Sequence, residues 1–367
     1  MEQFSEQPIE HEYISSARAA GLYYVTDEMP GIRRRRHGRG FSYVAPDGQT
    51  VRDPAMLRRF RSLVIPPAWT EVWICPDPNG HLQVTARDAR GRKQYRYHTA
   101  FREQRDGIKF ERMIAFSDVL LAIRERVEHD IALPGLPRAK VMATVVWLLE
   151  RTLIRIGSNE YAKANKSFGL TTLRQRHVRV AGSKLRFDFR GKSGVVHSVA
   201  VTDRRVARIV QRCQELPGQE LFQYVDGDGA RQSVQAEDVN AYLHEIAGRD
   251  VTAKDFRTWA GTMLTAESLR TMGPAPSARQ AERNIVAAID RTASRLGNTR
   301  SVCRKYYIHP ALLEAYREGE VLPPLPQPVW RERQVAVMPL RQHEAEVLAF
   351  LKARLERQRQ SDVRSAE

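Results

Sequence analysis

The chain has 367 residues, a hydrophobic fraction of 42% and a formal net charge of +16. This length predicts two domains, and so large a basic excess favours a polyanionic partner, with nucleic acid ahead of an anionic membrane surface. We find no apolar run long enough for a membrane span and no signal-peptide pattern. The three scattered cysteines predict neither a disulfide framework nor a zinc pair, and this cysteine usage favours a reducing, intracellular compartment.

The N-terminal third of the sequence predicts a small β domain. Residues 1–28 are expected to form an arm or a short helix without a clear core face. The basic run at 31–40 is interpreted either as a solvated, mobile segment or as a phosphate contact. Turn signals then separate strands expected at 41–44, 49–51, 72–75, 82–85 and 93–98. We therefore expect a mostly antiparallel domain over 29–101, whose last strand suits a nucleic-acid groove.

A charged segment, residues 102–112, is interpreted as a linker to a mainly helical domain at 113–322. Ser117 is expected to cap its first helix. A nearly apolar helix over 138–155 is expected to be central, with Gly157 as its C-terminal stop. Three short strands follow at 177–180, 185–189 and 195–201, and helices resume from 203 to 316.

The last segment, 323–367, combines a proline-rich spacer at 323–328 with an amphipathic helix. Its apolar positions are Leu340, Val347, Leu348, Leu351 and Leu355. The pattern does not decide whether this helix packs back on the chain or meets a partner.

A set of basic residues and one tyrosine carries the chemistry. Tyr307 follows a short basic segment, and a phenol with a pKa near 10 needs nearby cations or a base to attack phosphorus. Arg155 falls at the expected end of the apolar helix, where it either complements the helix dipole or clamps a phosphate. The capping-box spacing of Thr252 and Asp255 places Arg257 inside the next helix, where a second guanidinium could stabilise transition-state charge.

Two further side chains extend this set. Lys192 lies at a hairpin tip between glycines, either merely solvated or able to protonate a leaving 5′ oxygen. Asn298 has an amide donor one helix junction away from Tyr307 and cannot act as an acid. Cys303 is interpreted as a small packed thiol. Together these residues suggest metal-free phosphoryl transfer onto a tyrosine, with no cofactor.

Eight collinear segments resemble the small poxvirus-like and bacterial type IB DNA topoisomerases. The segments are 31–41, 65–69, 83–95, 154–157, 169–173, 191–194, 254–259 and 304–307. The resemblance covers roughly residues 29–318 and implies an α+β fold: an antiparallel β-rich N-terminal domain and a helical catalytic domain with a short three-stranded sheet, which close as a clamp on duplex DNA.

The resemblance also implies the residue roles. Tyr307 would form a 3′-phosphotyrosyl link, Arg155 and Arg257 would bind the scissile phosphate, Lys192 would be the general acid and Asn298 would donate to a phosphate oxygen. The expected DNA contacts are Arg92, Lys93, Gln94, Tyr95, Tyr161 and Lys254. Reversible transesterification needs neither ATP nor a metal, and a monomer acting on nucleoid DNA in a bacterial cytoplasm is expected. Spacing within the family alone selects Tyr307 over Tyr306.

Two rival functions remain open on the residues alone. A tyrosine recombinase uses a related set, but its His-x-x-Arg box would read here as Lys254-Asp255-Phe256-Arg257, with lysine in the histidine position. A non-catalytic DNA-binding protein would have no reason to keep Lys192, Arg257 and Tyr307 together.

Overall fold

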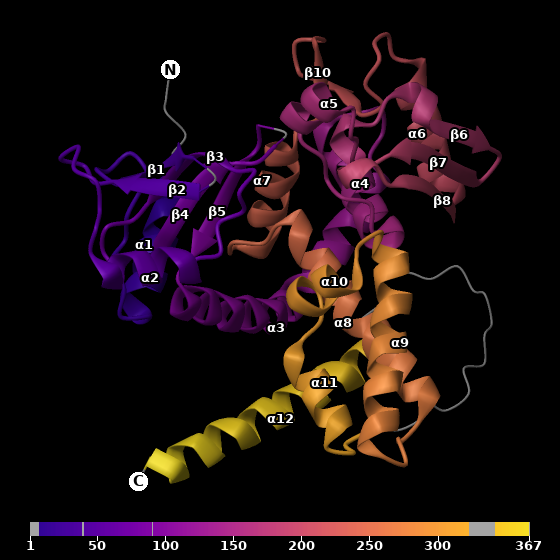
Figure 1. Cartoon of the computed structure of the whole chain (residues 1–367). Coiled ribbons are helices and arrows are strands. Elements are labelled where there is room, and N and C mark those ends of the chain that lie inside the picture. The colour runs from indigo at the N-terminus through magenta and orange to yellow at the C-terminus, as the bar shows by residue number, and fades with distance from the viewer. Residues whose placement is uncertain (1–6, 39, 90, 323–341, 367) are drawn as a thin grey trace. The chain divides into compact units, whose positions relative to one another are not determined.

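The computed structural model describes residues 7–38, 40–89, 91–322 and 342–366. It divides into two compact units, Met1–Glu111 and Arg112–Glu367, each with a hydrophobic core of its own (Figure 1). Within the described ranges, no helix combines the length and the apolar character that crossing a membrane would take. The architecture is α+β: among the described residues the first unit has one antiparallel sheet, and the second has a three-stranded and a two-stranded antiparallel sheet with most of the helices.

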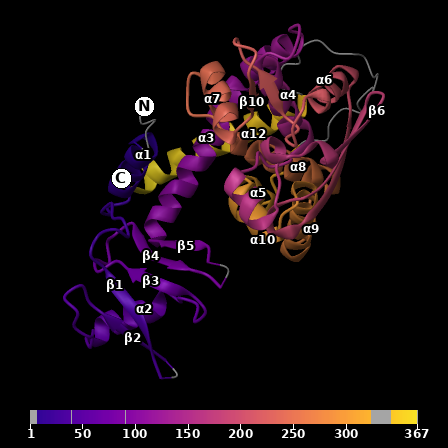
Figure 2. The ribbon, with the colours of Figure 1, turned by 90° about the horizontal axis from the view of Figure 1, so that it is seen from above.

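The first unit is built on a five-stranded antiparallel sheet in the order β2-β1-β3-β4-β5. The strands are β1 (Ile32–His37), β2 (Gly40–Val44), β3 (Thr70–Ile74), β4 (Leu82–Arg87) and β5 (Lys93–Tyr97). The helix α2 (Pro54–Ser62) lies beside this sheet (Figure 2). Its Phe60 is buried in one cluster with Ile74 and Val84 of the sheet. Asp53 caps this helix by accepting from two backbone N–H groups.

Three expectations for the first unit are corrected. The basic run forms strand β1, paired on both sides, so the interpretation as a mobile segment is wrong, and the interpretation as a phosphate contact stays a prediction. Residues 49–51 form an isolated bridge rather than a strand. The arm contains α1 (Gln7–Ala19), which does have a core face, since Ala17 of this helix is buried with Leu22 and Phe101, and Tyr13 packs against them.

The expected linker at 102–112 is helical. It lies inside α3 (Thr99–Ile131), and the boundary between the units falls at Glu111 within this helix. Ser117 therefore does not cap a helix: its hydroxyl donates to the carbonyl of Ile114, within α3. The segment is rich in residues of good helix propensity, and one interior glycine costs only about 1 kcal/mol.

The second unit packs its helices around a single core that includes a three-stranded sheet in the order β6-β7-β8. The helices not yet given are α4 (Arg138–Thr152), α5 (Asn159–Asn165), α6 (Arg204–Glu215), α7 (Ala236–Ala247), α8 (Ala253–Met272), α9 (Ala278–Leu296), α10 (Arg300–Tyr306), α11 (Pro310–Arg317) and α12 (Gln342–Ala366). Short 3-10 turns are η1 (Leu170–Thr172), η2 (Gln175–His177) and η3 (Lys192–Gly194), and a small hairpin joins β9 (Gln223–Val225) to β10 (Arg231–Ser233).

The three-stranded sheet confirms the expected strands. They are β6 (Val178–Ala181), β7 (Lys184–Arg190) and β8 (Val196–Thr202). Along β7, burial alternates with period two, so Leu185, Phe187 and Phe189 face the core. The connection between β7 and β8 carries Lys192 on the turn η3.

The apolar helix ends earlier than the sequence predicts. Helix α4 stops at Thr152, and the left-handed residue after it is Leu153 (φ 57°) rather than a glycine. Arg155 therefore lies on the segment beyond the helix, and Gly157 is not its C-terminal stop. The backbone N–H of Leu170 donates to the carbonyl of Arg155 at 2.8 Å, which fastens this segment to η1.

The C-terminal helix packs back on the second unit. Val347, Leu348 and Leu351 join its core, and the carboxylate of Glu344 accepts from the indole of Trp259 at 3.1 Å. Arg124 binds the same carboxylate at 3.0 Å. The expected proline-rich spacer at 323–328 and the apolar position Leu340 lie outside the described residues.

Candidate active site

Helix α8 presents Arg257 to the ends of two other helices. The carboxylate of Asp255 accepts from the backbone N–H of Thr252 at 2.8 Å, which fixes the helix start as expected. The guanidinium is 4% exposed and donates to the carbonyls of Leu153 and Leu296, the latter at 2.8 Å. Both carbonyls lie where α4 and α9 terminate, and such groups lack helical partners and carry partial negative charge.

Tyr307 lies directly beneath this guanidinium. It caps the C-terminus of α10, and its ring centroid is 5.2 Å from Cζ of Arg257. Its neighbour Tyr306 is 40% exposed and lies instead beside Lys305. Of the two tyrosines that the sequence offers, Tyr307 is therefore the one that the fold brings to the buried cation.

Arg155 and Asn298 meet on the other side of the site. Helix α9 ends at Gly297, a left-handed residue (φ 60°). The guanidinium of Arg155 donates to the Oδ1 atom of Asn298 and, at 3.4 Å, to the carbonyl of Gly297. Thr299 then caps α10, so a single helix junction orients Asn298 and starts the helix that leads to Tyr307.

The electrostatics of the site favour an incoming anion. Burial, and then the charge of Arg155, lower the pKa of the Arg257 guanidinium from its ordinary value. Two buried donors, Nε of Arg257 and Nδ2 of Asn298, have no hydrogen-bond partner among the described residues. Buried donors are rarely left unsatisfied, so an acceptor-rich, negatively charged group would complete this site.

Cys303 lies one helical turn before Tyr307 and is fully buried. Burial raises the pKa of its thiol to about 11, although the nearby arginines act in the opposite direction. The thiol therefore stays protonated at neutral pH, and the prediction of a small packed side chain is confirmed.

Lys192 lies apart from these four residues. It is exposed on η3, and its ammonium is 5.9 Å from the ring centroid of Tyr161, itself 45% exposed. Within the described ranges, no hydrogen bond joins Lys192 to the cluster of Arg155, Arg257, Asn298 and Tyr307. The structure thus brings four of the five expected catalytic residues together and places the fifth on an adaptable turn.

The expected DNA contacts divide between the units. On β5 and the turn before it, Tyr95 is 48% exposed, whereas Lys93 is paired with Asp27 at 2.7 Å. Arg92 and Gln94 both bind the carboxylate of Asp88, at 2.7 and 2.9 Å. In the second unit, Lys254 is exposed in the first turn of α8.

Two residues at the site were not predicted from the sequence. Gly261, one turn after Arg257, faces the backbone of Tyr307 so closely that a Cβ would lie 2.3 Å from its carbonyl oxygen. His197 faces inward from β8 beside the Lys192 turn. The alternation along β8 could have indicated the direction of His197, but no sequence pattern indicates the contact of Gly261.

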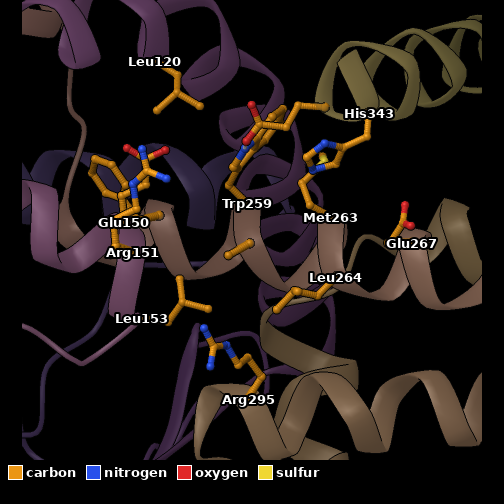
Figure 3. A pocket seen from close by; sticks show the side chains of 13 residues that line it. Leu120, Glu150, Arg151, Leu153, Trp259, Met263, Leu264, Glu267, Arg295 and His343 are labelled. Atoms are coloured by element: carbon orange, nitrogen blue, oxygen red, sulfur yellow. Dashed lines mark hydrogen bonds between the residues drawn. The ribbon is translucent and has the colours of Figure 1, made fainter. Parts of the chain in front are cut away.

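A cavity of about 220 Å³ lies among α3, α4, α8, α9 and α12, and in Figure 3 the side chain of Met263 points towards that of His343. Leu153 lines this cavity, and its carbonyl holds Arg257, but none of the five expected catalytic residues lines it. Over the described residues, no cluster of three or more histidine, cysteine, aspartate or glutamate side chains could hold a metal ion.

Comparison with known proteins covers most of the chain. Residues 98–320 match the family model of the eukaryotic DNA topoisomerase I catalytic core, and residues 40–88 match that of the bacterial DNA topoisomerase IB N-terminal domain. DNA topoisomerase 1B of Acanthamoeba polyphaga mimivirus is 31% identical over 298 residues, which cover 79% of this chain and 89% of the relative. DNA topoisomerase 1B of vaccinia virus (strain Copenhagen) is 22% identical over 241 residues, 64% of this chain and 72% of the relative.

Proposed function

Because this chain belongs to the type IB DNA topoisomerases, we propose that Tyr307 is its nucleophile and that Arg155, Arg257, Asn298 and Lys192 act on the scissile phosphate. The enzyme is an isomerase whose substrate is DNA. It relaxes supercoils by cutting one strand transiently, letting that strand swivel and resealing it. The residue roles are the part of the mechanism that this proposal adds.

The observation that carries these roles is the pair of unsatisfied donors beside Tyr307. Nε of Arg257 and Nδ2 of Asn298 are buried without an acceptor among the described residues. The non-bridging oxygens of a phosphodiester would accept from both, and two guanidiniums would stabilise the charge that grows on these oxygens in the transition state. The ring centroid of Tyr307 is 5.2 Å from Cζ of Arg257, so a phosphodiester held by these donors would lie beside the phenol.

The proposed cleavage step balances without a cofactor. The phenol oxygen of Tyr307 attacks phosphorus and its proton passes to solvent. The bond from phosphorus to the 5′ oxygen breaks, and Lys192 supplies the proton that this oxygen takes up. The DNA is left with a 3′-phosphotyrosyl end and a free 5′ hydroxyl. Resealing is the reverse reaction, and it needs no ATP because the new ester conserves the phosphodiester energy.

The DNA contacts form a second part of the proposal. Exposed Tyr95 offers a flat surface for the duplex, and Arg92, Lys93 and Gln94 on the same edge would exchange their carboxylate partners for phosphates or base edges. In the second unit, Tyr161 and Lys254 would contact the backbone near the cleavage site. We propose that the two units close on the duplex, that the enzyme acts as a monomer, and that it works on nucleoid DNA in a bacterial cytoplasm.

The decisive experiment is relaxation of negatively supercoiled plasmid with EDTA present and ATP absent. Wild type and Tyr306→Phe should relax the plasmid, and Tyr307→Phe should not. Denaturing the wild-type reaction should trap protein on the 3′ end of the broken strand. Relaxation by Tyr307→Phe, or protein trapped on the 5′ end, would contradict the proposed nucleophile. Strand exchange between two duplexes would instead favour a recombinase.

A further inference from the structure

His197 has no role in the proposed mechanism, yet it lies between two of its parts. The alternation of exposure along β8 turns the imidazole to the inner face of the three-stranded sheet. There it stacks on Phe189, the residue of β7 that is paired with His197, with ring centroids 5.1 Å apart and an interplanar angle of 14°. This stacking fixes the plane of the imidazole ring.

Two glycines pack against the edges of this ring. Gly191 directly precedes Lys192, and a Cβ there would lie 2.6 Å from Cδ2 of His197. Gly297 directly precedes Asn298, and a Cβ there would lie 2.5 Å from Cε1. Gly191 has a φ of −96°, which any residue adopts. Its lack of a side chain is therefore explained by the imidazole ring and not by the backbone.

The two contacts differ in rigidity. Gly297 ends the long helix α9, and its N–H donates to the carbonyl of Ser294. Lys192 and Ser193 are exposed, and the backbone hydrogen bonds that close their turn among the described residues are short-range, from Gly191 to Val195 and from Gly194 to Gly191. A contact with the rest of the protein must hold an adaptable turn of this kind in place if the Lys192 ammonium is to reach one atom of the substrate. The imidazole ring is the group that lies nearest to a Cβ at Gly191, with Phe189 behind it at 3.7 Å.

We propose that His197 is a positioning residue, which relays the position of the Gly297–Asn298 junction to the turn that carries Lys192. The ring thus fixes the position of Lys192, the general acid, relative to the residues that bind the phosphate. This inference rests on the proposed role of Lys192. It is supported by the neutral state of the ring, since burial and then the charges of Arg155 and Arg257 lower the pKa of His197.

The test uses a leaving group that needs no general acid. A duplex with sulfur in place of the bridging 5′ oxygen expels a thiolate, which leaves without a proton. His197→Ala should cleave the ordinary duplex about 10- to 100-fold more slowly than wild type, since misplacement by about 1 Å costs that much. On the sulfur-containing duplex, its single-turnover rate should lie within threefold of wild type. Lys192→Ala should show the same pattern, and the double variant should be no slower than Lys192→Ala alone.

Two further variants keep the inference falsifiable. Gly191→Ala presses a methyl group against the ring from the position directly before Lys192. It should also be slow on the ordinary duplex and near wild type on the sulfur-containing duplex, even if His197→Ala fails to fold. Val199→Ala, on the same face of β8, removes packing without touching the turn and should leave both rates unchanged.

The outcomes separate the two proposals. A Lys192→Ala enzyme that stays slow on the sulfur-containing duplex would refute the general acid itself. If Lys192→Ala is rescued while the His197 and Gly191 variants stay slow on both duplexes, or cleave both like wild type, the positioning role is wrong.

Discussion

Replacing Gly261 by alanine tests how the fold holds the nucleophile. Gly261 lies inside α8, and a Cβ there would meet the Tyr307 carbonyl oxygen at 2.3 Å and the Tyr307 Cβ at 2.9 Å. The next residue, Thr262, donates to the same carbonyl at 3.4 Å and accepts from the backbone N–H of His309 at 3.1 Å. The segment that carries the nucleophile is thus attached directly to the surface of α8.

The size of the effect follows from these distances. Ordinary van der Waals contact begins at 3.4 Å, so the Tyr307 backbone would have to retreat by about 1 Å. A displacement of this size costs roughly 100-fold in rate, or about 2.7 kcal/mol in the barrier. Stability should change less, because overpacking costs about 1–3 kcal/mol while alanine gains about 1 kcal/mol over glycine inside a helix.

The assay is single-turnover cleavage of a duplex with a mapped site at saturating enzyme, together with DNA affinity and melting temperature. Gly261→Ala should bind DNA like wild type and cleave about 100-fold more slowly. Gly227→Ala is the matched control, because a Cβ on that hairpin glycine meets no atom within 4 Å. Cleavage by Gly261→Ala within threefold of wild type would refute the argument that this contact positions Tyr307.

Three other expectations concern stability and DNA affinity. Glu344→Ala should lower the free energy of unfolding by about 3 kcal/mol, because it removes a buried partner of two side chains, whereas Lys352→Ala, which breaks an exposed pair, should cost under about 1 kcal/mol in the same denaturant titration. Arg34→Ala should destabilise the protein by about 2–3 kcal/mol, because the Arg34 guanidinium donates hydrogen bonds to three backbone carbonyls. Arg35 is exposed, so Arg35→Ala should leave stability unchanged and should lower the number of counterions released on DNA binding by about one. Burial raises the pKa of Asp130, but its hydrogen bonds outweigh burial and hold the pKa below its usual value. The stabilisation by this carboxylate is therefore complete above about pH 4 and is lost as the pH falls through the folded-state pKa. Acid unfolding of Asp130→Asn should depend less on pH in that range.

Local patterns predicted much of the architecture. The period-two alternation of Lys184–Arg190 identified β7 correctly, because one face of that strand is buried. The spacing of Thr252 and Asp255 identified the start of α8, because this capping interaction joins residues only three positions apart in the chain. Four of the five catalytic candidates also meet in one place, and their order along the chain did not require this.

Apart from the helical segment 102–112, where a local signal was misread, the failures have one physical cause, which is that tertiary contacts override local signals. A solvated, mobile segment was one interpretation of the arginines of β1, but Arg34 donates hydrogen bonds to carbonyls of the loop before β3. Gly157 looked like a helix stop, but Leu153 takes the left-handed conformation while its carbonyl is held by Arg257. The contacts of His197 and Gly261 depend on segments distant in sequence, so no window along the chain contains them.

Helix α12 has a consequence for the order in which the enzyme becomes competent during synthesis. The match to the catalytic-core family ends at residue 320, yet α12 covers part of α8, the helix that carries Arg257 and Gly261. The ribosome makes α12 after every other described element of the second unit. The first unit can fold while translation continues, but the far side of α8 stays uncovered until Leu351 has emerged. The surface of α8 around Trp259 is therefore covered last among the described parts of this core during synthesis.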